Sequence, residues 1–283
     1  NSLWLAMVIT AGTTLLGGCA STEEQVEKKL LVYPEAPDQA RFYFERTIMS
    51  NLDVEFETED SLAQRWLTGV GKVGKGMVKP FDVATHKGRI FVSDPPRQLV
   101  HIFDVKEYTY ARVGEADDVV LQKPFGIDVD DKGNLYVMDQ TAGDIKVYSR
   151  DGDYLRSFGD KKMFSMPTGL AVNDLGTKLY ISDTGGVRSR DHHILEFDVK
   201  SGKLLQTIGT RGKGDVEFNL PKDIVLDDKN NHLYVVDSGN FRVQVVDLDD
   251  NTLVRSIGKI GRRPGQFSRP KGIALDASGN VYV

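Results

Sequence analysis

The sequence predicts an all-β fold, a β-propeller built of four-stranded blades. A pattern of strand, turn and strand recurs five times, in residues 79–94, 123–139, 166–183, 220–237 and 269–283. Each copy starts near a proline, at Pro80, Pro124, Pro167, Pro221 and Pro270. Successive prolines are 44, 43, 54 and 49 residues apart, which is the length of a four-stranded blade. One such sheet cannot bury both of its faces alone, so the copies must stack radially.

The four strands of each blade, which we call a to d in chain order, follow from local pattern. Strand a comes directly after the proline and is largely apolar, as expected for an inner strand covered on both faces. A turn such as residues 131–134 leads to strand b. Strand c covers, for example, residues 242–247, and strand d covers residues 154–158. A glycine then marks the return of the chain to the axis, at Gly114, Gly159, Gly209 and Gly258.

An aspartate ends strand b in four of the copies, at Asp94, Asp139, Asp183 and Asp237. Carboxylates at strand ends commonly accept hydrogen bonds from nearby turns. We therefore interpret these residues as structural, bonded to the next turn or to a neighbouring blade.

These copies resemble the NHL repeat family. The strings KPFGIDVDDKGNLYVMD (123–139) and NHLYVVDSGNFRVQVVD (231–247) carry the likeness, which extends over about residues 79–283. Two copies depart from the family pattern, because Asp82 and Asp223 stand where the pattern has glycine. The resemblance implies a rigid disc, here of six blades, that binds proteins or other ligands.

The segments outside the repeats complete the predicted fold. Residues 40–48, ARFYFERTI, have strand character, and we expect them to close the ring as strand d of the last blade. The fifth copy stops after strand b, so we expect a chain truncated at both ends. Residues 59–69 have apolar side chains at helical spacing and predict a short surface helix, with Trp66 as its packing anchor.

The N-terminal residues indicate a lipoprotein leader. Residues 3–17 form an uncharged apolar run, followed by Gly17, Gly18 and Cys19, the single cysteine of the chain. Residues 16–19 resemble a bacterial lipobox, which implies a signal peptide over 1–18, lipid attachment at Cys19, a tether over 19–39 and a propeller over 40–283. Ala20 favours the outer membrane, with the protein facing the periplasm. The alternative is an uncleaved membrane anchor with a buried thiol.

The loops predict a charge difference between the two faces of the disc. In an antiparallel blade the b–c loops and the d–a linkers share one face, and these linkers are rich in Lys and Arg. The turns of the other face are rich in Asp. A basic face attracts anionic ligands, and the long loop 183–194 lies on it. The candidate ligand-binding residues of the basic face are Arg188, Arg190, His192, His193, Lys222, Arg262, Arg263 and Lys271. The alternative is that these loops are simply solvated.

A metal site is a second hypothesis. Related propellers include calcium-dependent lactonases and a zinc-dependent amidating lyase, and Asp82 and Asp223 begin inner strands from which carboxylates could approach the axis. The five histidines do not recur at one blade position, and no nucleophile elbow or phosphate loop is present. No cofactor is predicted, although Ca²⁺ or Zn²⁺ at these aspartates is the weak alternative.

The sequence therefore favours a non-enzymatic function. The leading hypothesis is a lipid-anchored envelope propeller that serves as a ligand-binding or protein-interaction scaffold. Its expected partner is a protein or an anionic envelope ligand, and the net charge of −5 argues against a general nucleic-acid-binding surface. The alternative is a metal-dependent hydrolase or lyase of the lactonase or amidating-lyase type.

Overall fold

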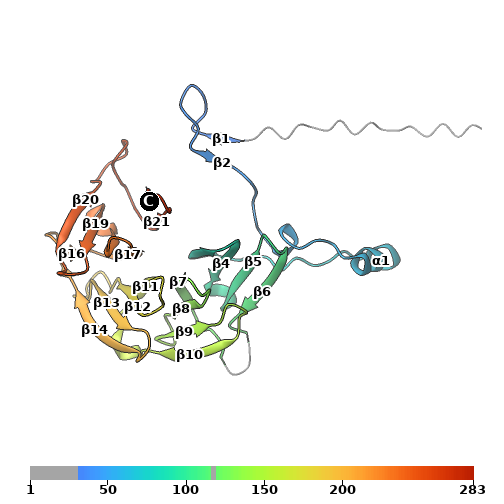
Figure 1. The fold of residues 1–283 in the computed structure, drawn as a ribbon, viewed down its shortest axis with the longest axis horizontal. Helices are drawn as coiled ribbons and strands as arrows, with labels where there is room; N and C mark the ends of the chain where they lie inside the picture. Colours follow the sequence, from blue (N-terminus) through green and yellow to red (C-terminus); the bar gives the residue numbers. More distant parts are fainter. Residues whose placement is uncertain (1–30, 116–118) are drawn as a thin grey trace, which may run out of the picture. The chain divides into compact units, whose positions relative to one another are not determined.

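Four complete blades follow one another around a common centre in the computed structural model, which describes residues 31–115 and 119–283 (Figure 1). Blade 1 contains β3 (Val83–His86), β4 (Arg89–Asp94), β5 (Leu99–Asp104) and β6 (Thr109–Val113). Blade 2 contains β7 (Pro124–Val129), β8 (Leu135–Asp139), β9 (Asp144–Tyr148) and β10 (Tyr154–Phe158). Blade 3 contains β11 (Pro167–Val172), β12 (Lys178–Asp183), β13 (His193–Asp198) and β14 (Lys203–Ile208). Blade 4 contains β17 (Pro221–Asp227), β18 (His232–Asp237), β19 (Arg242–Asp247) and β20 (Leu253–Ile257).

Every complete blade has its strands in the order a, b, c, d, and all of its strand pairs are antiparallel. A fifth blade is represented by the pair β21 (Ala274–Leu275) and β22 (Val281–Tyr282). The linker between blades 3 and 4 contains a short parallel pair, β15 (Thr210–Arg211) with β16 (Glu217–Phe218). The propeller of four-stranded blades is thus confirmed, and the count of six blades stays a prediction.

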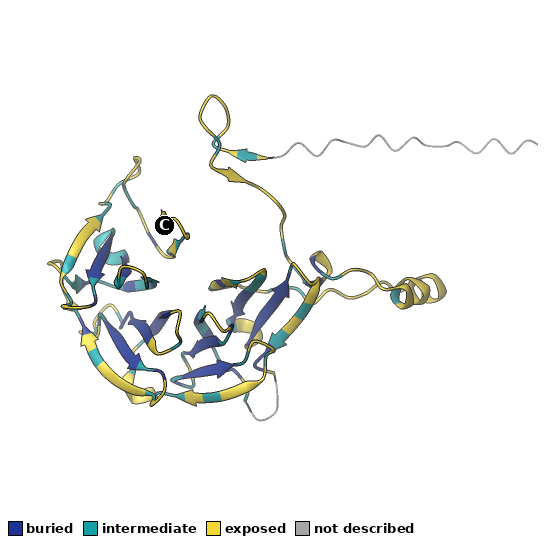
Figure 2. Ribbon diagram, in the orientation of Figure 1, coloured by how far each residue is buried: buried dark blue, intermediate teal, exposed yellow. Residues whose placement is uncertain are grey.

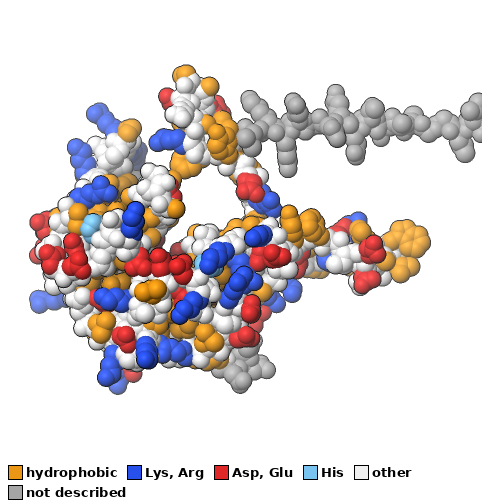
Figure 3. All heavy atoms as spheres, viewed as in Figure 1, with side chains coloured by type: hydrophobic (Ala, Val, Ile, Leu, Met, Phe, Trp, Pro, Cys, Tyr) orange, Lys and Arg blue, Asp and Glu red, His pale blue; other side chains and the backbone are white. Residues whose placement is uncertain are grey.

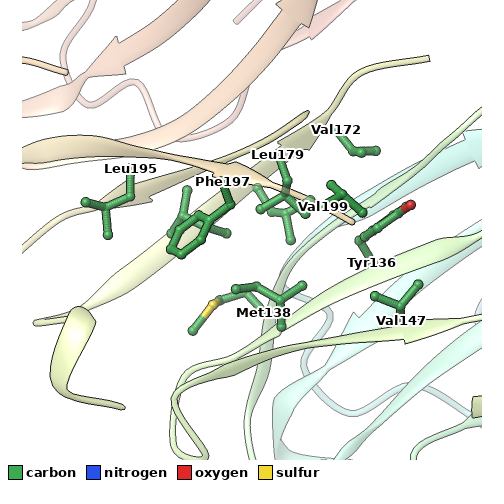
Figure 4. Close-up of a cluster of buried hydrophobic side chains, with 11 residues drawn as sticks. Tyr136, Met138, Val147, Val172, Leu179, Leu195, Phe197 and Val199 are labelled. Atoms are coloured by element: carbon green, nitrogen blue, oxygen red, sulfur yellow. The ribbon is translucent and has the colours of Figure 1, made fainter. Parts of the chain in front are cut away.

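The hydrophobic core lies between successive blades. Strands b and c are buried, whereas strand d at the rim is largely exposed (Figure 2). Between blades 2 and 3, side chains of β8 and β9 meet those of β11, β12 and β13 (Figure 4). Phe197 is fully buried in this cluster and packs against Phe158 and Phe164, with ring centroids 6.1 and 5.9 Å away. Burial of a side chain of this size stabilises the fold by about 2 kcal/mol.

The N-terminal segment has a partner that the sequence did not predict. The chain divides into two compact units, Asn1–Thr47 and Ile48–Val283, so residues 40–47 belong to the first unit. In that unit β2 (Phe42–Tyr43) pairs antiparallel with β1 (Val32–Tyr33). The strand expected in this segment is therefore present and is bonded to β1, and its role in closing the ring stays a prediction. The apolar run, the lipobox and Cys19 lie outside the described residues.

The predicted helix is present as α1 (Glu59–Thr68). Thr58 caps its first turn by accepting the backbone N–H of Ser61 at 3.3 Å, and Gly69 ends it in the left-handed conformation. The role expected for Trp66 is wrong, because its side chain is 85% exposed and no residue of α1 is buried. None of the helices in the described part of the chain is long and apolar enough to cross a membrane.

Candidate functional site

The aspartates at the ends of the b strands pin the linker that enters each blade. All four, Asp94, Asp139, Asp183 and Asp237, are fully buried. In blade 3 the carboxylate of Asp183 accepts the backbone N–H groups of Ser165 and Met166 at 2.6 and 2.7 Å. Blades 1 and 2 repeat both bonds to the two residues that precede their prolines. The structural interpretation of these aspartates is confirmed.

A second set of carboxylates joins the inner strands of neighbouring blades. Asp82 accepts the N–H of Val83 at 2.8 Å and the N–H of Ile127, from blade 2, at 2.9 Å. Asp128 forms the same two bonds to its own strand and to blade 3, and Asp223 forms them to its own strand and to the fifth blade. These half-buried side chains therefore act as latches between inner strands. Asp128 does not stand out in the sequence, because it lies four residues after its proline rather than two.

The latch carboxylates have raised pKa values because they are removed from water. Burial, followed by the charge of Asp223, raises the pKa of Asp82 well above its usual range. Burial raises the pKa of Asp128 to about 7 and that of Asp223 to about 6. The charge of Asp223 in blade 4 contributes to the raised pKa of Asp82 in blade 1. These latch carboxyl groups therefore hold their protons more tightly than an exposed aspartate does.

These aspartates fit a metal ion poorly. Both oxygens of Asp82 and of Asp223 already accept backbone N–H groups, so a metal ion would have to compete with these bonds. In residues 31–115 and 119–283, no three His, Cys, Asp or Glu side chains come together in an arrangement that could hold a metal. We therefore derive no chemistry from a metal at this position.

The b–c loops and d–a linkers lie together, as the blade topology predicts. The guanidinium of Arg211 in the linker after blade 3 donates to the backbone oxygen of Ser189 in the long b–c loop, at 2.7 Å. On the other face, successive a–b turns are linked, because the N–H of Asp174 donates to Asp228 at 2.9 Å. Figure 3 shows one face of the blades, on which Lys and Arg side chains lie among acidic ones and acidic side chains gather near the centre and at the left rim.

The acidic face modifies the titration of its own carboxyl groups. Burial, followed by the charges of Asp228 and Asp131, raises the pKa of Asp174. These residues come from the a–b turns of blades 2, 3 and 4, so three separate loops bring their carboxylates together. The Asp-rich turns that loop composition assigns to this face therefore lie close enough for their charges to interact.

His192 has a structural position in the long b–c loop. Its side chain is fully buried. The N–H of Leu220 donates to Nδ1 at 3.1 Å, so the other ring nitrogen, Nε2, carries the proton and donates to the oxygen of Gly186 at 3.1 Å. The ring therefore fastens this loop to the linker that enters blade 4, and both nitrogens are engaged. His193, the next residue, begins β13 and is half-buried opposite Asp183.

The remaining candidates divide into two groups. Arg188, Arg190, Arg262 and Arg263 are exposed on the long loop of blade 3 and on the linker that follows blade 4. Lys222 and Lys271 each follow a proline directly, at the inner ends of adjacent blades, and Lys222 is half-buried. The structure thus places the arginines on the outer loops and the two lysines beside the axis.

Comparison with known families supports the repeat. The family model for the NHL repeat matches residues 218–246, which cover most of strands a to c of blade 4. The chain is 32% identical over 90 residues to NHL repeat-containing protein 2 of Gallus gallus, a match to 29% of this chain and 11% of that protein. It is 31% identical over 114 residues to NHL repeat-containing protein 3 of Homo sapiens, a match to 37% of this chain and 31% of that protein. The chain therefore spans less than a third of either relative.

The fold is also found among solved structures. A gluconolactonase from Xanthomonas campestris superposes with a TM-score of 0.53 at 20% identity, over 71% of this chain and 66% of that enzyme. At this level of identity the similarity concerns the fold alone. The residues of the site must therefore be argued from their own geometry.

Proposed function

We propose that this NHL-repeat β-propeller is a binding scaffold. It holds an acidic partner on the face formed by its b–c loops and d–a linkers. The rigid blades fix the loops, and the loops supply cations for recognition. Acidic side chains of a partner protein are the ligand that such a face attracts at long range and retains by direct contact.

The observation that carries the proposal is a set of exposed arginines without carboxylate partners. None of the ion pairs within the described residues involves Arg188, Arg190, Arg262 or Arg263. Some basic residues of the blades do have carboxylate partners: Arg89 pairs with Asp104 at 2.9 Å and Lys178 with Glu196 at 3.0 Å. The cations of the loop face are therefore available to a partner.

Binding of poly-L-glutamate to the immobilised protein tests this function. A face variant replaces four arginines with glutamine: Arg188→Gln, Arg190→Gln, Arg262→Gln and Arg263→Gln. A control variant removes the same charge from exposed turns of the opposite face: Lys106→Gln, Lys132→Gln, Lys200→Gln and Lys229→Gln. We expect about a tenfold loss of affinity in the face variant at low salt and less than a twofold change in the control. Equal losses in both variants would show that net charge alone determines binding.

The alternative function is that of a metal-dependent hydrolase or lyase. The approach of Asp82 and Asp223 at the axis supports it, and the engagement of all four of their oxygens counts against it. Titration calorimetry with Ca²⁺ and with Zn²⁺ separates the two functions. Saturable binding that disappears in Asp82→Asn would favour the enzyme over the scaffold.

We also propose that the propeller is anchored in the bacterial envelope by lipid on Cys19 and faces the periplasm. The support is the apolar run and the lipobox-like residues 16–19. Expression of the complete precursor in a bacterial host with labelled palmitate tests this location. The label should enter the wild-type protein and the membrane fraction, and it should be absent from Cys19→Ala.

A further inference from the structure

The residues that directly follow the recurring prolines form what we call the axial mouth. They are Phe81, Phe125, Thr168, Lys222 and Lys271, one from each blade in chain order. Each stands where a d–a linker passes into an inner strand, so the axial mouth opens on the basic face. The inner strands that carry these residues are bonded from blade to blade: Asp82 accepts the N–H of Ile127, Thr168 donates to the oxygen of Lys222, and Asp223 accepts the N–H of Ile273. The five residues therefore follow one another around the axis.

One side of the axial mouth is an aromatic platform. The rings of Phe81 and Phe125 stack with centroids 4.1 Å apart and planes 8° from parallel. The Lys123 ammonium lies 4.8 Å from the centre of the Phe125 ring. Phe81 remains 48% exposed despite the stack. A flat side chain placed on this platform would remove apolar surface from water and gain a further aromatic contact.

The other side of the axial mouth is a pair of lysines. Asp223, the residue after Lys222, accepts the N–H of Ile273, two residues after Lys271, at 2.9 Å, so the two lysines begin neighbouring inner strands. Burial and the ammonium of Lys271 both lower the pKa of Lys222. No ion pair in the described part of the chain neutralises either of them. The backbone at Lys222 is fixed, because its oxygen accepts the hydroxyl of Thr168 at 2.7 Å. Repulsion between half-buried Lys222 and exposed Lys271 is relieved when an anion binds between them.

The carboxyl groups beneath the mouth restrict how such an anion can sit. Asp82 and Asp223 follow directly after Phe81 and Lys222, and when ionised they repel any negative group that moves down the axis. An anionic ligand is therefore held at the surface. An extended chain that lies across the mouth satisfies this condition.

We propose that the axial mouth is the primary contact for the acidic partner, and that it binds a peptide segment in which an aromatic residue is flanked by Asp or Glu. The aromatic ring stacks on Phe81, and the flanking carboxylates bind Lys222 and Lys271. This inference rests on the proposed function, because it names the partner segment of the same basic face. It assigns specificity to the mouth and long-range attraction to the outer arginines.

Fluorescence anisotropy of two labelled pentapeptides, Glu-Glu-Phe-Glu-Glu and Glu-Glu-Ala-Glu-Glu, tests the proposal on the full chain. We expect the wild-type protein to bind the Phe peptide about fivefold more tightly than the Ala peptide. In Phe81→Leu this preference should fall to less than twofold, while the affinity for the Ala peptide stays unchanged. In the double variant Lys222→Gln with Lys271→Gln, both peptides should lose at least about tenfold in affinity.

The controls separate failure of this inference from failure of the proposed function. Lys132→Gln with Lys229→Gln removes two exposed lysines from the opposite face and should change neither peptide. Equal binding of the two peptides, or a Phe preference that survives in Phe81→Leu, would overturn the axial mouth. The scaffold function would still stand if poly-L-glutamate binding depended on the outer arginines. Binding of N-acetylphenylalanine as tight as that of the Phe peptide would identify a small aromatic acid as the ligand and refute the peptide.

Discussion

Replacing Asp128 with asparagine removes one ionisable group from the latch between blades 2 and 3. The wild-type carboxylate accepts the N–H groups of Val129 and Val172 at 2.8 and 2.9 Å. Asparagine keeps a single oxygen acceptor, so one of these N–H groups loses its partner. That loss costs about 1 to 3 kcal/mol of stability at any pH. The pH-dependent part of the change comes from the carboxyl group alone.

The sign of this pH-dependent change in stability follows from the pKa values of Asp128 in the folded and unfolded chain. Burial raises the pKa of Asp128 from 3.8 to about 7, so the folded protein holds the proton more tightly than the unfolded chain. The resulting stabilisation is present at low pH and is lost as the pH rises from about 4 to about 7. Between pH 4.5 and pH 8 this stabilisation changes by at most about 3 kcal/mol. Solvent screening at this half-buried site reduces the expected change to about 2 kcal/mol.

Urea unfolding followed by circular dichroism at pH 4.5 and pH 8 measures this difference. Asp128→Asn should destabilise the propeller by about 2 kcal/mol more at pH 4.5 than at pH 8. Asp104→Asn is the control. Burial of Asp104 opposes ionisation, but hydrogen bonds from Glu107 and Arg89 outweigh it and lower the pKa, so this group stays ionised throughout the range. The control should cost the same at both pH values. A pH-independent cost for Asp128→Asn would refute the burial argument.

Three further substitutions test the packing of the blades. A Cβ atom on Gly126 would lie 2.7 Å from the backbone nitrogen of Leu170 in the next blade, so Gly126→Ala should lower stability by about 2 kcal/mol in urea unfolding; an unchanged midpoint would contradict this close approach. Phe197→Ala empties a fully buried position, and we expect calorimetry to show a loss of about 3 to 5 kcal/mol. A loss below about 1 kcal/mol would mean that the core between blades is loosely packed. Asp183→Ala removes the acceptor of three backbone N–H groups, those of Ser165, Met166 and Gly185, and should cost more than Asp183→Asn, which keeps one acceptor oxygen. Equal costs would contradict the pinning role.

The candidate site was only partly predictable from the sequence. The basic loop residues were visible because a blade's topology assigns each loop to a face. Asp128 was missed because its place in the repeat differs from that of Asp82 and Asp223, although its carboxylate forms the same bonds. The stacked pair Phe81 and Phe125 was also missed, because residues in adjacent copies meet only when the blades are side by side.

His192 shows the opposite limitation. A histidine in a long polar loop is typical of a ligand-binding residue, and His192 was predicted to be one. The fold instead buries the ring against Leu220 of the next linker. Its role depends on a contact between residues 28 positions apart, which no local pattern encodes.

The sequence by itself determined the blade, its four strands and the boundaries between copies, because alternation, turn residues and the recurring proline are local properties of the chain. It also determined which loops share a face, because antiparallel order requires it. Only the tertiary structure decided which side chains meet at the axis and what their charges do there. The distances between inner strands set the burial of the latch carboxylates, the stacking of Phe81 on Phe125 and the approach of Lys222 to Lys271, and those distances exist only once the blades have stacked.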